Sequence, residues 1–310
     1  MQTTALTVRG LRKRYGRRWA LDGLDLDVPR GSLFGLVGSN GAGKTTMMTC
    51  CAGLLQVDGG EINLLGSGFP DPDRLRGRYA ILPQDARLPL HARVGELMFY
   101  YARLIGMTAA DARNQIGELL EWVNLSDRRD APVRTLSHGM MRRLTVAQAF
   151  LGQPELVFLD EPMSGLDPRE VNRLRDLLTR RPAGQTIVIS SHILGELEMI
   201  CDHVAFIEKG KRVKQGPLSA MVRRHHRLTY RLRPGNWPEG MLRALPVQAT
   251  WSFLPDKQVM EVMLDDEQRD PVEVNALILR VLLDAGVGIE EVTRGSDLER
   301  EFLHATATGS

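Results

Sequence analysis

The sequence has little cysteine and no long apolar run, and each absence excludes a class of protein. Its 310 residues include only three cysteines, Cys50, Cys51 and Cys201. None of them forms a C-x-x-C pair and two are adjacent, which argues against a disulfide framework or a zinc site. Because no apolar stretch reaches about 18 residues, we expect that the chain cannot span a bilayer by itself. A reducing, cytoplasmic setting fits these features best.

Excess charge, a leader segment and repeats are also missing. The net charge is +2, which gives no general attraction to nucleic acid or membrane, so no nucleic-acid partner is expected. The N-terminus lacks the apolar region of a signal peptide. No internal repeat, low-complexity tract or sustained heptad pattern is visible. The length allows one large α/β domain together with a smaller one.

Strand-like and helix-like segments alternate over residues 1–216, which predicts an α/β sheet. Residues 32–37, SLFGLV, form an apolar run that is typical of a buried parallel strand. A mostly helical block over about residues 88–151 looks like an insertion into the sheet. The remaining predicted elements are strands at residues 6–9, 24–28, 156–159, 186–189 and 203–207, and helices at residues 93–105, 109–123, 139–151 and 193–201.

The pattern changes near Gly216 and Pro217, which predicts a domain boundary at that point. Asp270 and Pro271 have the residue types of an N-cap and a first helical position. Residues 217–310 are therefore expected to form a small α+β domain. Its expected elements are strands at residues 228–233, 247–253, 259–264 and 287–292, a helix from Pro271 to about Ala285, and a helix from Ser296.

A glycine-rich turn follows the first apolar strand. Residues 38–45 read GSNGAGKT and match the pattern G-x-x-x-x-G-K-[ST]. Its three glycines let the backbone wrap closely around a polyphosphate, and the following helix, predicted from Thr45 to about Leu55, adds its positive N-terminal end. In such loops the lysine, here Lys44, lies between the β- and γ-phosphates, and the Thr45 hydroxyl holds Mg²⁺. The pattern therefore predicts a site for a nucleoside triphosphate.

Two acidic residues, Asp160 and Glu161, follow the apolar run at residues 156–159. Ligands of open parallel sheets bind at the carboxyl ends of the strands. Asp160 is then placed to bind Mg²⁺, and Glu161 is placed to activate the attacking water as general base. An acidic pair after a strand can equally be a solvated turn, but the phosphate loop upstream favours the functional interpretation.

A third motif lies at residues 135–143, TLSHGMMRR. Ser137 is expected to cap a helix that starts near Gly139 and directs its N–H groups toward an anion. Together the three motifs resemble the nucleotide-binding subunits of ABC transporters, whose signature usually reads LSGGQ. His138 replaces a glycine of that signature and Met140 replaces its glutamine, a form that is similar to ATPases paired with ABC-2-type membrane subunits.

The resemblance extends to four more positions in the correct order. Tyr15 resembles the aromatic residue that stacks on adenine, and Gln84 resembles the Q-loop residue that senses Mg²⁺. Asp167 ends a D-loop-like SGLD segment and is expected near the phosphate loop of a second copy, whereas His192 resembles the switch histidine at the γ-phosphate. The resemblance thus implies Glu161 and His192 as catalytic residues, Thr45, Gln84 and Asp160 as Mg²⁺ ligands, and Tyr15, Gly38, Ser39, Asn40, Gly41, Ala42, Gly43, Lys44, Thr45, Thr46, Gln84, Ser137, Gly139 and Asp167 as ATP contacts.

The family resemblance also implies a fold and an activity. The expected fold is a RecA-like P-loop NTPase core with an N-terminal antiparallel β part, an inserted helical subdomain and a small C-terminal α+β domain for dimerisation or regulation. The expected function is ATP hydrolysis by a head-to-tail homodimer with two composite sites. That dimer would power an ABC-2-type exporter with separately encoded membrane-spanning permease subunits. It would lie peripherally on the cytoplasmic face of the inner membrane.

Alternatives remain open at this point. A soluble ATPase of complex assembly is compatible with the sequence. The L-S-x-G-M form disfavours an importer ATPase, and the intact Glu161 and His192 disfavour a regulator that binds ATP without hydrolysing it. The basic run at residues 223–227 could contact lipid headgroups, but it more often indicates a solvated linker. The sequence does not select a transported cargo.

Overall fold

A computed structural model describes residues 4–182, 184–221, 226–234, 249–264 and 271–295 of the chain. The chain divides into two compact units, residues 1–218 and 219–310. The division falls after Leu218, directly after strand β9 (Lys211–Pro217) and close to the boundary expected near Gly216 and Pro217. The helix predicted from Ser296 lies outside the described residues.

A six-stranded sheet forms the centre of the first unit, in the order β5-β6-β7-β3-β8-β9. The first five of these strands are parallel, and β9 is antiparallel to β8 at the edge. Every residue of β3, β6 and β7 is buried, which explains their apolar runs. The strand bounds are Leu33–Val37 for β3, Tyr79–Leu82 for β5, Leu156–Leu159 for β6, Thr186–Ser191 for β7 and His203–Glu208 for β8.

Parallel pairing places the carboxyl ends of β5, β6, β7 and β3 along one edge of this sheet. Val37 of β3 is opposite Ser191 of β7, and Leu159 of β6 is opposite Ile189. The segments that follow these strands carry the phosphate loop, Gln84, the acidic pair and His192. Residues far apart in sequence therefore meet because their strands are neighbours.

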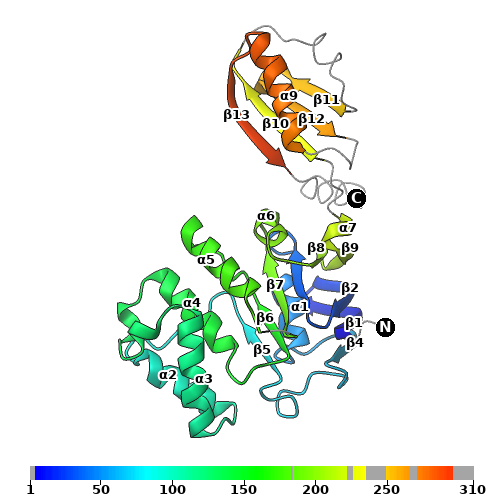
Figure 1. The fold of residues 1–310 in the computed structure, drawn as a ribbon. Coiled ribbons are helices and arrows are strands. Elements are labelled where there is room, and N and C mark those ends of the chain that lie inside the picture. Colours follow the sequence, from blue (N-terminus) through cyan, green and yellow to red (C-terminus); the bar gives the residue numbers. More distant parts are fainter. Residues whose placement is uncertain (1–3, 183, 222–225, 235–248, 265–270, 296–310) are drawn as a thin grey trace. The chain divides into compact units, whose positions relative to one another are not determined.

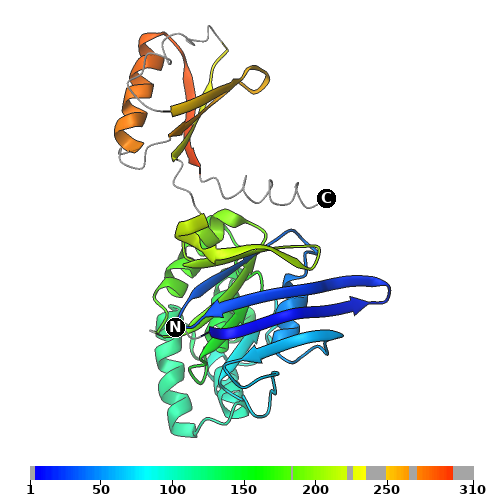
Figure 2. The ribbon, with the colours of Figure 1, turned by 90° about the vertical axis from the view of Figure 1, so that its right-hand side faces the viewer.

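A second, antiparallel sheet has the order β2-β1-β4, with bounds Arg18–Pro29, Thr4–Tyr15 and Gly59–Leu64. Figure 2 shows β1 and β2 as a long hairpin in blue. One hydrophobic core joins both sheets to helix α1 (Lys44–Cys51) through residues such as Leu24, Phe34 and Met47. Helix α1 ends before the predicted Leu55, because Gly53 adopts φ +71° just beyond its C-cap.

The inserted helical block contains α2 (Val94–Leu104), α3 (Ala109–Trp122) and α4 (His138–Ala149). These helices have a core of their own, and Figure 1 shows them grouped on one side of the six-stranded sheet. The ends of these three helices lie within about two residues of the predicted ends. Sequence reasoning missed helix α5 (Pro168–Thr179), although Asp167 and Pro168 are typical of a helix start. Other short elements are α6 (Leu194–Glu198), α7 (Leu218–Met221), η1 (Ser126–Arg128) and η2 (Val133–Thr135).

The second unit contains a four-stranded antiparallel sheet in the order β11-β12-β10-β13. Helix α9 (Pro271–Asp284) packs on this sheet through Val274, Ile278 and Leu282, which recur at helical spacing. The buried Tyr230 hydroxyl donates a hydrogen bond of 2.7 Å to Asn275 on this helix. The remaining elements are β10 (His226–Leu232), β11 (Ala249–Leu254), η3 (Pro255–Lys257), β12 (Val259–Leu264) and β13 (Ile289–Gly295).

All three cysteines are buried and unpaired, which gives a testable chemical property. Burial raises the pKa of Cys50 to about 11 and raises the pKa of Cys51 and Cys201 as well. Since the thiolate is the reactive form, even Cys50 presents only about one thiolate per thousand thiols at pH 8. We expect dithionitrobenzoate to modify the native chain very slowly at pH 8. The unfolded chain in guanidinium serves as the control, and rapid titration of the native thiols would contradict the described burial.

Candidate functional site

The phosphate loop has a backbone shape that requires glycine. Gly41 and Gly43 adopt φ +81° and +109°. A Cβ atom on Gly43 would lie 2.7 Å from the backbone oxygen of Ala20, so a side chain does not fit. Helix α1 begins at the next residue, Lys44, with its N-terminal N–H groups toward the loop. The strand, loop and helix thus follow one another as a phosphate cradle requires.

Lys44 is held at the centre of this loop and is only 6% exposed. Its Nζ donates hydrogen bonds to the backbone oxygens of Gly38, at 2.7 Å, and Ser39, at 3.4 Å. The same atom lies 3.1 Å from Glu161 Oε1 as a buried ion pair. The loop therefore places a fixed positive charge directly beside the Glu161 carboxylate.

Asp160 links the loop to the sheet. It is 1% exposed and accepts hydrogen bonds of 2.6 Å from the hydroxyls of Thr45 and Ser190. Ser190 Oγ also accepts a hydrogen bond of 2.8 Å from the backbone N–H of Glu161. Ser190, which sequence reasoning missed, therefore positions both acidic residues.

The donor set at this point fits Mg²⁺. A threonine hydroxyl and a carboxylate lie within hydrogen-bond distance of each other beside the phosphate loop. Mg²⁺ favours a few protein oxygens and takes its other ligands from phosphates and water. In the described part of the chain, no three His, Cys, Asp or Glu residues cluster as a soft-metal site would need.

Glu161 and His192 form a second pair at the strand ends. His192 Nδ1 lies 2.9 Å from Glu161 Oε2, and Glu161 is only 5% exposed. Glu161 adopts φ +46°, a left-handed conformation that is uncommon for a residue with a side chain. The backbone is therefore strained at the residue predicted to be the general base.

The phosphate loop and Glu161 line a pocket of about 560 Å³, a volume in the usual range for small-molecule sites. Tyr15 lies at its wall with 55% of its surface exposed, as stacking on a flat ring would require. Arg18, from the next strand, also lines the pocket and was not predicted. The lining residues are Tyr15, Arg18, Ala20, Asn40, Gly41, Ala42, Gly43, Lys44, Thr45, Thr46, Gln84 and Glu161.

Arg142, on helix α4, ties the signature motif to this site and was also missed. Its guanidinium donates to the backbone oxygens of Pro162 at 2.7 Å, Gln84 at 3.2 Å and Glu161 at 2.6 Å. A fourth, longer bond of 3.4 Å reaches the backbone oxygen of Asp160. One side chain thus holds the Q-loop and the acidic pair against the helical block.

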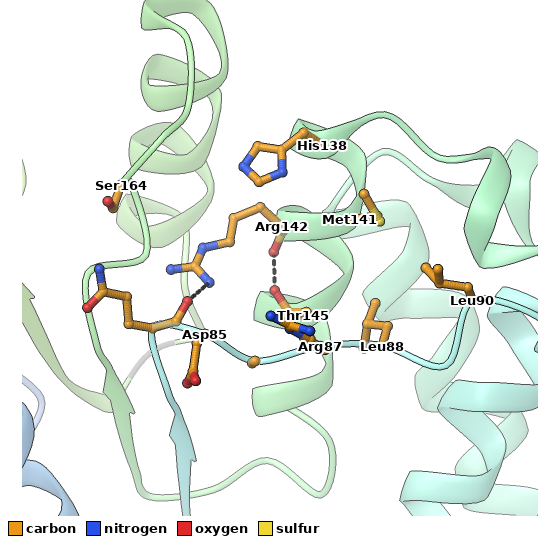
Figure 3. A pocket seen from close by; sticks show the side chains of 11 residues that line it. Asp85, Arg87, Leu88, Leu90, His138, Met141, Arg142, Thr145 and Ser164 are labelled. Atoms are coloured by element: carbon orange, nitrogen blue, oxygen red, sulfur yellow. Dashed lines mark hydrogen bonds between the residues drawn. The ribbon is translucent and has the colours of Figure 1, made fainter.

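Burial lowers the pKa of Arg142, and the charges of Asp160 and Glu161 oppose that shift. Figure 3 shows the side chain reaching from α4 toward the loop that carries Asp85. Arg142 also borders a second pocket, of about 480 Å³. This pocket is lined by Gln84, Asp85, Ala86, Arg87, Leu88, Leu90, His138, Met141, Arg142, Thr145 and Ser164.

The other predicted contacts do not line the 560 Å³ pocket. Ser137 caps α4, and its hydroxyl accepts a bond of 3.2 Å from the N–H of Met140. Asp167 caps α5 by accepting bonds of 2.9 Å and 3.0 Å from the N–H groups of Arg169 and Glu170. Gly139 lies in the first turn of α4. The predicted site residues therefore fall into two groups on this unit. The first group lies around Lys44 and the acidic pair, and the second group consists of Ser137, Gly139 and Asp167 at the starts of α4 and α5.

The fold and the first group define a P-loop nucleoside triphosphatase, and comparisons with known proteins refine that class. Residues 21–164 match the family model described as ABC transporter. The chain is 41% identical to a Nod factor export ATP-binding protein I of Ralstonia nicotianae over 219 residues, covering 69% of this chain and 67% of that protein. It is 39% identical to the protein of the same name from Burkholderia orbicola, covering 72% and 74%.

Solved structures agree with this result. The ATP-binding subunit of an ABC transporter matches with a TM-score of 0.63 and 29% identity, over 71% of this chain and 92% of that subunit. A Clostridium perfringens protein described as part of the cbiONQ ABC transporter complex matches with a TM-score of 0.63 and 27% identity, covering 70% and 90%. This chain belongs to the ABC transporter family, as one of its ATP-binding subunits.

Proposed function

We propose that this chain binds Mg-ATP in the 560 Å³ pocket and hydrolyses it to power an ABC-2-type membrane exporter. The observation that best supports the proposal is the series of contacts from Lys44 to Glu161 and from Glu161 to His192. The hydrogen-bonded pair of Thr45 and Asp160 lies beside them. These contacts place a cation for phosphate beside a candidate general base, which in turn contacts its histidine partner. The relatives named for Nod factor export support the direction of transport.

In this proposal the loop residues 38–46 surround the phosphates with N–H groups, and Tyr15 stacks on adenine. Lys44 exchanges its contact with Glu161 for the β- and γ-phosphates. Thr45, Gln84 and Asp160 hold Mg²⁺, which neutralises charge on the phosphates when it is bound.

Glu161 then accepts a proton from the water that attacks the γ-phosphate, and the bond to the β-phosphate oxygen breaks to give ADP and phosphate. His192 orients the Glu161 carboxylate through the 2.9 Å contact and reaches the γ-phosphate. The left-handed backbone of Glu161 keeps the carboxylate at this position.

We further propose that two copies of the chain pair head to tail and share two composite sites. Ser137 and Gly139 belong to the start of α4 and Asp167 caps α5, and none of them lines the pocket that holds Lys44. The resemblance to ABC ATPases supports their contact with nucleotide on a second copy. The capped N-terminus of α4 supplies N–H groups and a positive dipole end for a γ-phosphate. Residues 217–310 are proposed to form an accessory domain for dimer contact or regulation.

The proposed partners are separately encoded ABC-2-type permease subunits, with the ATPase on the cytoplasmic face of the membrane. In the described residues, no helix has both the length and the apolar character needed to cross a bilayer. The L-S-H-G-M form of the signature, with His138 and Met140, supports an ABC-2-type partner.

Affinity purification tests the exporter role. A tagged Glu161→Gln variant, extracted from its source membranes with mild detergent and ATP, should retain a multi-span protein at equal stoichiometry. The same preparation without nucleotide is the control. If the variant stays free of any membrane partner, the exporter role is wrong, and an assembly-type ATPase becomes the better description.

A further inference from the structure

The glycine of the signature motif has an unexpected neighbour. A Cβ atom on Gly139 would lie 2.6 Å from Cγ and 2.7 Å from Oε2 of Glu170. Such distances are far inside van der Waals contact, so a side chain at Gly139 displaces the Glu170 carboxyl group. Glu170 lies in the first turn of α5, directly after the D-loop-like segment. The space beside Gly139 is therefore filled from within this chain.

The Glu170 carboxylate is not free to move aside. Its side chain is only 13% exposed, and Oε2 lies 3.2 Å from Nε of Arg143, which is itself 6% exposed at its side chain. The other carboxylate oxygen pairs with Arg173. Because both partners of the Arg143 pair are largely buried, moving the carboxylate leaves a buried charge without its counter-ion, which is strongly unfavourable.

Arg143 extends the connection to a third helix. On α4 it lies four residues after Gly139, and its Nη1 donates hydrogen bonds to the backbone oxygens of Val123 and Asn124 at the end of α3. The starts of α4 and α5 and the end of α3 thus share one buried ion pair.

We propose that Glu170 is a positioning residue that fixes the signature helix α4 against helix α5, and that its carboxyl group leaves no room for a side chain at position 139. The inference rests on the proposed function in one respect, namely that Ser137, Gly139 and Asp167 act together on the ATP of a second copy. A rigid link between α4 and α5 sets the spacing of the N–H groups at Gly139 relative to Asp167. Small misplacements of such groups reduce rates by roughly 10-fold to 100-fold.

A double-mutant cycle of the full-length chain tests this inference. Gly139→Ala should lower kcat about tenfold or more by pushing Glu170 off Arg143, and Glu170→Ala should lower kcat by a similar factor. The kcat of the double variant should be no lower than that of the less active single variant. The methyl group added at position 139 then occupies the space that the Glu170 carboxyl group has left. Glu170→Gln keeps the volume and removes the charge, so Gly139→Ala should still reduce kcat further in that background.

Two further readouts separate positioning from general instability. Binding of fluorescent mant-ATP to the monomer should stay within about twofold in every variant, since none of the changes touches the phosphate loop. Thermal midpoints of the four proteins form a second cycle that requires no dimer, and these should also be non-additive. If the losses in kcat multiply as for independent sites, or if mant-ATP binding falls with kcat, the inference is overturned.

A failure of the dimer proposal can be distinguished from a failure of the positioning role by the oligomeric state of Glu161→Gln. If Glu161→Gln stays monomeric with Mg-ATP, the composite sites are wrong, and the thermal cycle still decides whether Gly139 and Glu170 are coupled. If Glu161→Gln dimerises and adding Glu170→Ala leaves the dimer dissociation constant unchanged, the positioning role is wrong while the dimer stands.

Discussion

Replacing Lys44 with alanine is expected to abolish nucleotide binding. The ammonium group is the buried positive charge of the phosphate loop, and its contacts with the backbone oxygens of Gly38 and Ser39 fix its position. Removing it also leaves the Glu161 carboxylate without its ion-pair partner beside the incoming phosphates. The lost attraction and the new repulsion together correspond to about 3–5 kcal/mol, or at least about a 100-fold loss of affinity.

Isothermal titration calorimetry or mant-ATP fluorescence on the purified chain measures this change. Lys257→Ala is a matched control, because it removes the same charge from an exposed position in the second unit. Its affinity for ATP should equal that of the unaltered protein. A Lys44→Ala variant that folds and still binds ATP tightly would refute the assignment of residues 38–45 as the phosphate loop.

Replacing Glu161 with glutamine is expected to trap ATP instead of preventing its binding. Glutamine keeps the shape of the side chain but cannot accept the proton of the attacking water, and general-base catalysis is worth roughly 10²–10⁴-fold. Neutralising Glu161 also frees Lys44 from its ion pair, so that its charge is available to the phosphates. We therefore expect a kcat lower by about 1000-fold and a stable ATP-bound dimer.

Phosphate release and size-exclusion chromatography with light scattering, each with Mg-ATP, measure the two effects. Glu121→Gln on the exposed face of α3 is the matched control and should leave turnover and oligomeric state unchanged. If Glu161→Gln remains monomeric with Mg-ATP and turns over at the normal rate, the general base is a different residue.

Two adjacent arginines of α4, Arg142 and Arg143, connect the two groups of site residues. Arg142 bonds to the backbone of the Q-loop and of the acidic pair, and Arg143 bonds to α3 and to Glu170. These adjacent arginines on α4 thus connect the helical block to both groups. Buried charge-assisted hydrogen bonds are costly to break, so these contacts hold the helical block firmly to both groups.

The sequence by itself determined the elements whose signals are local. The phosphate loop is a run of eight residues, and the acidic pair directly follows a fully buried strand. The three helices of the inserted block were predicted within about two residues, because helical signals such as the Ser137 cap are local in the sequence. The prediction was wrong where helices ended early, as α6 did at Glu198.

Helix α5 was missed although its signals are local, since Asp167 is an N-cap, Pro168 is at the first helical position, and Leu174 and Leu178 lie at helical spacing. The edge strands β5 and β9 were not predicted, because their sequences are short or partly exposed. Their existence depends on neighbours. Strand β5 pairs with β6, and β9 pairs with β8, so hydrogen bonds to distant segments specify them. Such pairing leaves only a weak signal in the local sequence.

The tertiary structure alone decided which groups touch. Lys44 meets Glu161, and Arg142 meets the backbone oxygens of Gln84 and Glu161, across long separations in sequence. Backbone oxygens carry no residue identity, so no motif could name them as partners of Arg142. Likewise, the sequence showed a glycine at position 139, and only the packing of α5 against α4 showed that Glu170 fills the space beside it.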